Sequence, residues 1–301
     1  MADAHHTSHI FQALAVNAAI TAAKGVAAVY TGSGAMLAET LHTASDCGNQ
    51  LLLLLGVRRA RQAPDAQHPL GYGRSLYFWS FIVALLLFTG GGVFSIYEGV
   101  HKLQVPEPVE RVWLGVAILG FSLLLEGWST WGNVKELSAR RGATPFFQYL
   151  TRTKDSDLVV IFGENAAAVV GLVLALAALG LSAATGDGRY DAVGSILVGC
   201  TLVAVAIFLG REVASLLIGE QADPALEAAV RAEVANDPSM QALLSLITVQ
   251  QGPGEVLLAM KVRLQDGLSG AEVVSAINAL ERRIKAQQPH VRWSFVEPDD
   301  A

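Results

Sequence analysis

Six long apolar stretches leave this chain few ways to fold. They cover residues 10–31, 35–57, 76–100, 112–133, 158–182 and 190–218. A helix needs about 20 mainly apolar residues to cross a bilayer. Charged residues make up only 16% of the 301 residues, against about 25% in soluble proteins. We therefore predict an integral membrane protein with an all-α, six-helix transmembrane domain over 10–218, preceded by a polar tip over 1–9.

The loops between these stretches predict how they are joined and oriented. Thr31-Gly32-Ser33-Gly34 is a tight-turn sequence, so the first two stretches should form an antiparallel helical hairpin. Lys and Arg concentrate in cytoplasmic loops. Nine lie in the 58–75 and 134–157 connections and three in the opposite loops: Arg58, Arg59, Arg61, Arg74, Lys135, Arg140, Arg141, Arg152 and Lys154, against Lys102, Arg111 and Arg189. We expect both termini in the cytoplasm, with a bacterial inner (plasma) membrane as the default location.

Beyond residue 218 the composition becomes that of a soluble domain. The segment 223–236 is amphipathic, and 244–251 and 255–264 resemble two strands separated by Gly252-Pro253-Gly254. Helical periodicity over 269–287 and alternation over 291–296 complete the order αββαβ. We predict a small cytoplasmic α+β domain over 219–301. The net charge of -6 and the absence of a long basic run argue against a nucleic-acid partner.

The second apolar stretch carries two ionisable residues, His42 and Asp46. Their i, i+4 spacing places both side chains on one helical face. Such groups inside a membrane cost at least about 2.5 kcal/mol on insertion scales and indicate function by default. An imidazole and a carboxylate at this spacing could hold one zinc-like ion. The alternative is a His–Asp hydrogen bond that only satisfies two buried polar groups.

The fifth stretch contributes Glu164 and Asn165. Glu164 is a candidate metal ligand because a lone buried carboxylate is costly. Asn165 is either a fourth ligand or a group that hydrogen-bonds between helices. Other polar residues in the apolar stretches are Asn17, Lys24, Asn49, Gln50, Glu98, Glu126 and Asp191. Asn49 could support the site from behind, and Lys24 and Glu126 could pair across the bundle as structural or gating charges.

A second candidate cluster lies in the 58–75 loop. Asp65 and His68 are three residues apart and could hold a metal weakly, and Tyr72 follows them. A solvated loop without metal is the alternative. The tail contains one histidine, His290, and therefore no histidine cluster.

These residues resemble the cation diffusion facilitator family over about 10–298. The segment from Gly32 to Asp46 is similar to the family's second-helix signature with an HxxxD or DxxxD pair. His68-Pro69-Leu70-Gly71-Tyr72-Gly73-Arg74 is similar to its HPxGHGR-type loop. Tyr97-Glu98-Gly99 and Leu216-Leu217-Ile218-Gly219-Glu220 fit as well. The resemblance implies six spans followed by a ferredoxin-like αββαβ tail.

Within the family, the chain is similar to the zinc transporter 9-like branch, through Glu126-Gly127-Trp128-Ser129 and Glu164-Asn165-Ala166-Ala167. Most members carry a second ligand pair in the fifth span, and that pair falls here on Ile161 and Asn165. Because Ile161 cannot coordinate, the resemblance implies a site of His42, Asp46 and Glu164, with Asn165 as a further candidate. Tyr72 stands where a second loop histidine is usual.

The resemblance implies a homodimer in the lipid bilayer that exports a divalent metal in exchange for protons by alternating access. Mixed nitrogen and oxygen ligands suit Zn²⁺, and also Co²⁺, Ni²⁺, Fe²⁺ and Mn²⁺; no prosthetic group is implied. A membrane metal sensor or scaffold with an incomplete site is the alternative. The sequence lacks GxSxG, HExxH and nucleotide-binding glycine motifs, so an enzyme is not expected.

Overall fold

The computed structural model describes the backbone of residues 2–105, 109–152 and 156–300, and the side chains of 17–105, 109–151 and 159–300. The chain divides into two compact units. The first comprises Met1–Leu55, Trp79–Leu150 and Asp157–Glu212, and the second comprises Gly56–Phe78, Thr151–Ser156 and Val213–Ala301. The N-terminal histidines His5, His6 and His9, whose side chains could contact metal, lie outside the described side chains.

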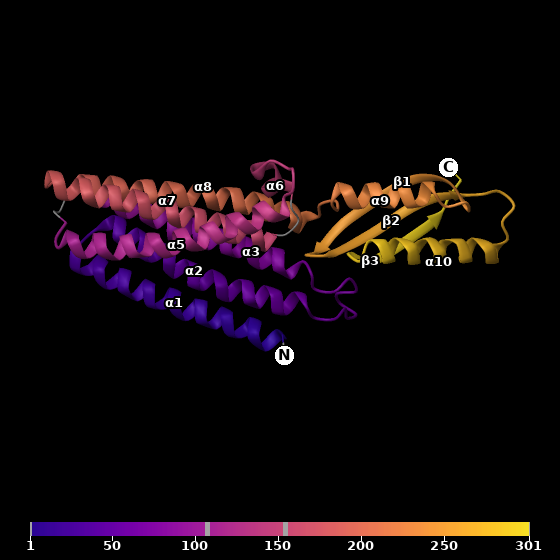
Figure 1. Ribbon diagram of the computed structural model, residues 1–301, viewed down its shortest axis with the longest axis horizontal. Helices are drawn as coiled ribbons and strands as arrows, with labels where there is room; N and C mark the ends of the chain where they lie inside the picture. Colours follow the sequence, from indigo (N-terminus) through magenta and orange to yellow (C-terminus); the bar gives the residue numbers. More distant parts are fainter. Residues whose placement is uncertain (1, 106–108, 153–155, 301) are drawn as a thin grey trace. The chain divides into compact units, whose positions relative to one another are not determined.

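Each predicted apolar stretch is helical in the structure (Figure 1). The long helices are α1 (Ala2–Thr31), α2 (Gly34–Ala60), α3 (Ser75–Leu86), α4 (Phe94–Gln104), α5 (Val112–Arg140), α7 (Ser156–Thr185) and α8 (Arg189–Ile218). A π-helical segment, η1 (Leu87–Val93), joins α3 to α4, and a short helix, α6 (Phe146–Arg152), follows α5. Helix α1 begins at Ala2, so the backbone of residues 2–9 is helical.

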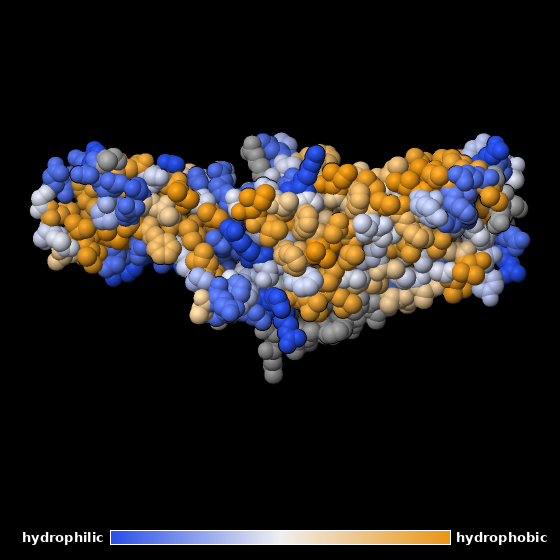
Figure 2. All heavy atoms as spheres, turned by 180° about the vertical axis from the view of Figure 1, so that it is seen from behind, coloured by the Kyte–Doolittle hydropathy of each residue, from blue (hydrophilic) through white to orange (hydrophobic). Residues whose placement is uncertain are grey.

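Within the described residues, four helical segments have the length and hydropathy to cross a membrane. They are Ser75–Gln104, Val112–Arg140, Val159–Thr185 and Arg189–Ile218. Helix α2 falls short because polar side chains such as Glu39, His42 and Asp46 lower its hydropathy. Large apolar side chains nevertheless cover the outside of the helical unit, at the right of Figure 2, between two more hydrophilic ends. This surface suits lipid contact.

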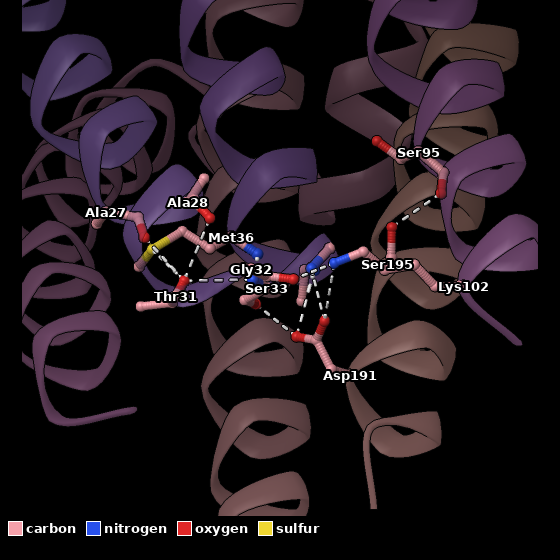
Figure 3. Close-up of polar contacts among 12 residues, drawn as sticks. Ala27, Ala28, Thr31, Gly32, Ser33, Met36, Ser95, Lys102, Asp191 and Ser195 are labelled. Carbon is pink, nitrogen blue, oxygen red and sulfur yellow. Dashed lines mark hydrogen bonds and ion pairs between the residues drawn. The ribbon is translucent and has the colours of Figure 1, made fainter. Parts of the chain in front are cut away.

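The turn between α1 and α2 and the first residues of α2 form a buried polar cluster (Figure 3). Gly32 adopts φ +67°, a left-handed conformation that glycine tolerates best. Asp191 of α8 accepts hydrogen bonds of 2.5 Å from the Ser33 hydroxyl and from the Gly34 N–H. Lys102 of α4 donates to the Gly32 carbonyl and lies 3.9 Å from Asp191. Three helices are therefore joined at the start of α2.

The second unit contains the predicted αββαβ order. It consists of α9 (Pro224–Ala235), β1 (Met240–Gly252), β2 (Glu255–Leu264), α10 (Gly270–Gln287) and β3 (Val291–Pro298). The sheet order is β1-β2-β3, with β1 antiparallel and β3 parallel to β2. Alternate residues of β2 are buried, as the period of two in a strand requires. They pack with α9 and α10 in one apolar core, so both helices cover one face of the sheet.

Local signals explain the boundaries of these elements. The Asp223 carboxylate accepts from the Ala225 N–H and caps α9, whose first residue is Pro224. Ser269 and Glu272 form a reciprocal capping box at the start of α10. Gly254 takes φ +70° in the turn between β1 and β2. Each of these residues is a known start or turn signal, which is why the sequence predicted the order.

Candidate metal-binding site

His42 and Asp46 lie on one face of α2, as their spacing predicts. The distance from His42 Nδ1 to Asp46 Oδ1 is 3.6 Å, and the side chains are 0% and 15% exposed. This distance is too long for a hydrogen bond between them. Within the described part of the chain, neither ring nitrogen of His42 nor Asp46 Oδ1 has a hydrogen-bond partner. Such buried, unsatisfied atoms are rare, and one imidazole nitrogen together with a carboxylate oxygen could bind a metal ion.

Glu164 lies on α7 and is buried. The Asn49 side-chain amide, one turn beyond Asp46 on α2, donates a 2.6 Å hydrogen bond to Glu164 Oε1. This bond brings the buried carboxylate of α7 to the α2 face that carries His42 and Asp46. Asn49 is thus the residue that positions Glu164, while its own Oδ1 is buried without a partner among the described residues.

Ile161 and Asn165, at the positions where most family members carry the fifth-span ligand pair, are less buried than Glu164. Ile161 is 41% exposed, so its side chain lies largely on the outer surface of the helical unit. Asn165 is half-buried, and its backbone carbonyl accepts a 3.3 Å hydrogen bond from Thr130 of α5. The buried acidic group of this window is therefore Glu164.

The described residues contain no group of three or more His, Cys, Asp and Glu side chains already arranged to hold a metal ion. His42, Asp46 and Glu164 consequently line the α2 and α7 faces without forming a closed coordination sphere. Capture of an ion by all three would require their side chains to move together.

Among the described side chains, the direct contacts of Lys24 are with Glu39 and Thr43 of α2, whereas the sequence suggested a pairing with Glu126. The Lys24 ammonium donates to Thr43 Oγ1 at 2.9 Å and lies 3.4 Å from Glu39 Oε2. Glu126 is half-buried on α5. Lys24 turns to α2 because the α1–α2 hairpin brings that helix alongside α1, whereas no sequence pattern specified its neighbour. Glu39 was overlooked; its position three residues before His42 on the same face was the available signal.

In the 58–75 loop, the Asp65 carboxylate accepts hydrogen bonds from other residues of the same loop. Its carboxylate accepts from the Tyr72 hydroxyl at 2.6 Å and from the backbone N–H groups of Gln67 and His68 at 2.9 and 2.7 Å. The Tyr72 hydrogen bond, followed by that of the His68 backbone, lowers the pKa of Asp65 to about 2. His68 Nδ1 lies 3.4 Å from Asp65 and the ring packs on Tyr72. Both oxygens thus serve the loop conformation.

Long apolar helices around a face of buried ionisable side chains define the class of this chain: an integral membrane protein of the ion-transporter kind. A family model described as the cation efflux transmembrane domain matches residues 10–218. The chain therefore belongs to the cation efflux family, the cation diffusion facilitators, and falls in its zinc transporter 9-like branch.

Several characterised relatives support this placement. The human mitochondrial proton-coupled zinc antiporter SLC30A9 is 34% identical over 255 residues, which are 84% of this chain and 45% of that protein. Metal tolerance protein C4 of Arabidopsis thaliana is 36% identical over 227 residues, 74% of this chain and 50% of that protein. Zinc transporter ZitB of Pectobacterium atrosepticum is 28% identical over 255 residues, 79% and 72% respectively. The chain spans about half the length of the first two.

These matches confirm the predicted family. Two of the relatives are named as a zinc antiporter and a zinc transporter, which agrees with the expectation that the chain is a transporter. The matches include both mitochondrial and bacterial proteins. The expectation of a bacterial inner membrane therefore stays untested.

Proposed function

We propose that this chain exports a divalent metal ion, zinc as the favoured cargo, in exchange for protons. The observation that carries the proposal is the set of buried, unpartnered donor atoms on His42 and Asp46, beside a Glu164 carboxylate held by Asn49. One imidazole and two carboxylates are ligand types that Zn²⁺ takes in proteins. Relatives named as zinc antiporter and zinc transporter support zinc over the other ions.

Exchange follows from the chemistry of these ligands. A metal ion binds neutral imidazole and ionised carboxylates, so proton binding to the same atoms opposes metal binding. Protons that reach His42, Asp46 and Glu164 from the far side would release the metal there. The three side chains are not prearranged around a metal ion in the structure. We therefore assign their closure around the ion to the loading step of transport.

The remaining architecture is proposed on the same basis. We propose six spans within 10–218, a ferredoxin-like domain over 219–301, cytoplasmic termini and a homodimer. Asn165 stays a candidate fourth ligand. We assign no metal to Asp65 and His68, because the Asp65 carboxylate is already engaged by Tyr72 and the loop backbone.

The test is zinc-for-proton exchange in proteoliposomes. We expect the unaltered chain to move zinc when a pH gradient is imposed, and Asp46→Asn and Glu164→Gln to lose at least 90% of that flux. Glu136→Gln removes an exposed carboxylate of α5 that pairs with Arg140 and should leave the flux unchanged. If no divalent ion moves with the unaltered chain, a metal sensor or scaffold replaces the transporter.

A further inference from the structure

Glu39 forms a second polar position on the α2 face. It is fully buried, and its Oε2 lies 3.4 Å from the Lys24 ammonium, which also donates to Thr43 Oγ1 at 2.9 Å. Glu39 Oε1 is buried and has no hydrogen-bond partner within the described side chains. A carboxylate and a hydroxyl therefore surround one cationic nitrogen, with a further oxygen lone pair left over.

Helix α7 makes room for this carboxylate. A Cβ atom at Gly171 would lie 2.3 Å from Glu39 Oε1, so any larger residue there would displace Glu39. Gly171 follows Glu164 by seven residues, or about two helical turns, and both therefore lie on one face of α7. The α2 and α7 faces thus meet at two levels: Glu39 with Gly171, and Asn49 with Glu164. Ten residues separate the α2 members, about 15 Å along the helix.

His42 and Asp46 lie between these two levels. Residues three apart on a helix have Cβ atoms about 5–6 Å apart, so an ion at His42 would be close to the Glu39 position. An ammonium is a compact point charge with three donors. The Lys24 ammonium therefore lies beside the buried Glu39 carboxylate, at a position that a second inorganic cation could otherwise take.

We propose that Glu39 and Thr43 form a second cation position on the α2–α7 face, and that Lys24 is the tethered cation that fills it. The inference rests on the proposed function, since it takes zinc as the ion bound at His42, Asp46 and Glu164. Lys24 keeps the face to one divalent ion at a time. Its positive charge also opposes prolonged retention of that ion, because like charges repel strongly where the dielectric is low.

The experiment is zinc binding to the full chain in detergent, measured by equilibrium dialysis and calorimetry. We expect one zinc ion per unaltered chain. Lys24→Met removes the charge, and should either add a second bound zinc or raise zinc affinity at least tenfold. Adding Glu39→Gln to that variant should return both values to those of the unaltered chain. Lys135→Met, which removes an exposed lysine of α5, should change neither.

Unchanged or weaker zinc binding in Lys24→Met would overturn the proposal and leave the ion pair with a structural role. So would a second zinc ion that persists after Glu39→Gln. Should Lys24→Met not fold, Lys24→Gln removes the charge but keeps an N–H donor for Thr43 Oγ1; zinc binding should then change as expected for Lys24→Met, and no change rejects the idea. If the unaltered chain binds no zinc, the proposed function itself fails. If it binds zinc and Asp46→Asn abolishes binding while Lys24→Met has no effect, only the present inference fails.

Discussion

The Tyr72 side chain determines whether Asp65 is available as a metal ligand. The family loop suggested a weak metal site, yet the Asp65 carboxylate is held by Tyr72 and by two backbone N–H groups. Tyr72 supplies this hydroxyl where the family more often has histidine. A hydrogen-bond donor occupies lone pairs of the carboxylate and leaves fewer of them for a cation. Tyrosine in place of histidine at position 72 therefore changes the role of the loop.

Tyr72→Phe should raise the pKa of Asp65 from about 2 towards its ordinary value, about 3.9, because it removes the largest cause of the shift. The folded-state pKa lies below the unfolded one, so the stabilising effect of this carboxylate is complete above about pH 4. That effect is lost as the pH falls towards 2. The measurement is a carboxyl ¹³C titration of the full chain. Tyr97→Phe, at an exposed tyrosine of α4, is the control; a shift in it, or none in Tyr72→Phe, would contradict the assignment.

The residues of the candidate site were predictable to different degrees. His42 and Asp46 follow from helical spacing alone, and Glu164 from the cost of a buried carboxylate. The structure added Asn49 as the hydrogen-bond donor to Glu164 and Glu39 as the neighbour of Lys24. These partners lie 115 and 15 residues apart in the chain, and no local pattern encodes such contacts.

Helix α2 shows how an element is fixed by residues outside it. Its first N–H groups, at Gly34 and Ala35, point at Asp191 of α8, and Lys102 of α4 lies beside the same carboxylate (Figure 3). A carboxylate at a helix N-terminus accepts hydrogen bonds from the unpaired N–H groups there, and its negative charge interacts favourably with the positive end of the helix dipole. The starting point of the helix that carries His42 and Asp46 therefore depends on a buried contact between three helices.

Asp191→Ala should destabilise the chain, because it leaves the Ser33 hydroxyl and the Gly34 N–H without their acceptor. Each unsatisfied buried donor costs about 1–3 kcal/mol. We expect the thermal unfolding midpoint of the full chain in detergent to fall by several degrees, and Asp191→Asn, which keeps one acceptor oxygen, to fall less. Glu110→Gln alters an exposed acid whose backbone N–H bonds to the Thr31 carbonyl at the same turn and should melt like the unaltered chain. Equal midpoints for Asp191→Ala and this control would reject the role.

For the whole molecule, the testable property is the path of the chain through the membrane. The predicted orientation places Gln62, in the 58–75 connection, in the cytoplasm and Glu110 on the opposite side. In a background with Cys47 and Cys200 replaced by alanine, we expect Glu110→Cys to react with an impermeant maleimide on intact cells. Gln62→Cys should react only after permeabilisation. The reverse result would invert the orientation, and reaction of both on intact cells would refute the proposed span between them.

The sequence by itself determined the helices, the αββαβ order and the candidate ligands on α2. These depend on local rules: apolar length, the 3.6 and 2.0 periods, capping residues and turn glycines. Tertiary structure alone decided that Lys24 pairs with Glu39, that Asn49 holds Glu164 and that Asp191 caps α2. A buried polar group must find a partner wherever the packed helices offer one. That choice depends on which faces meet in space, which the order of residues along one helix does not specify.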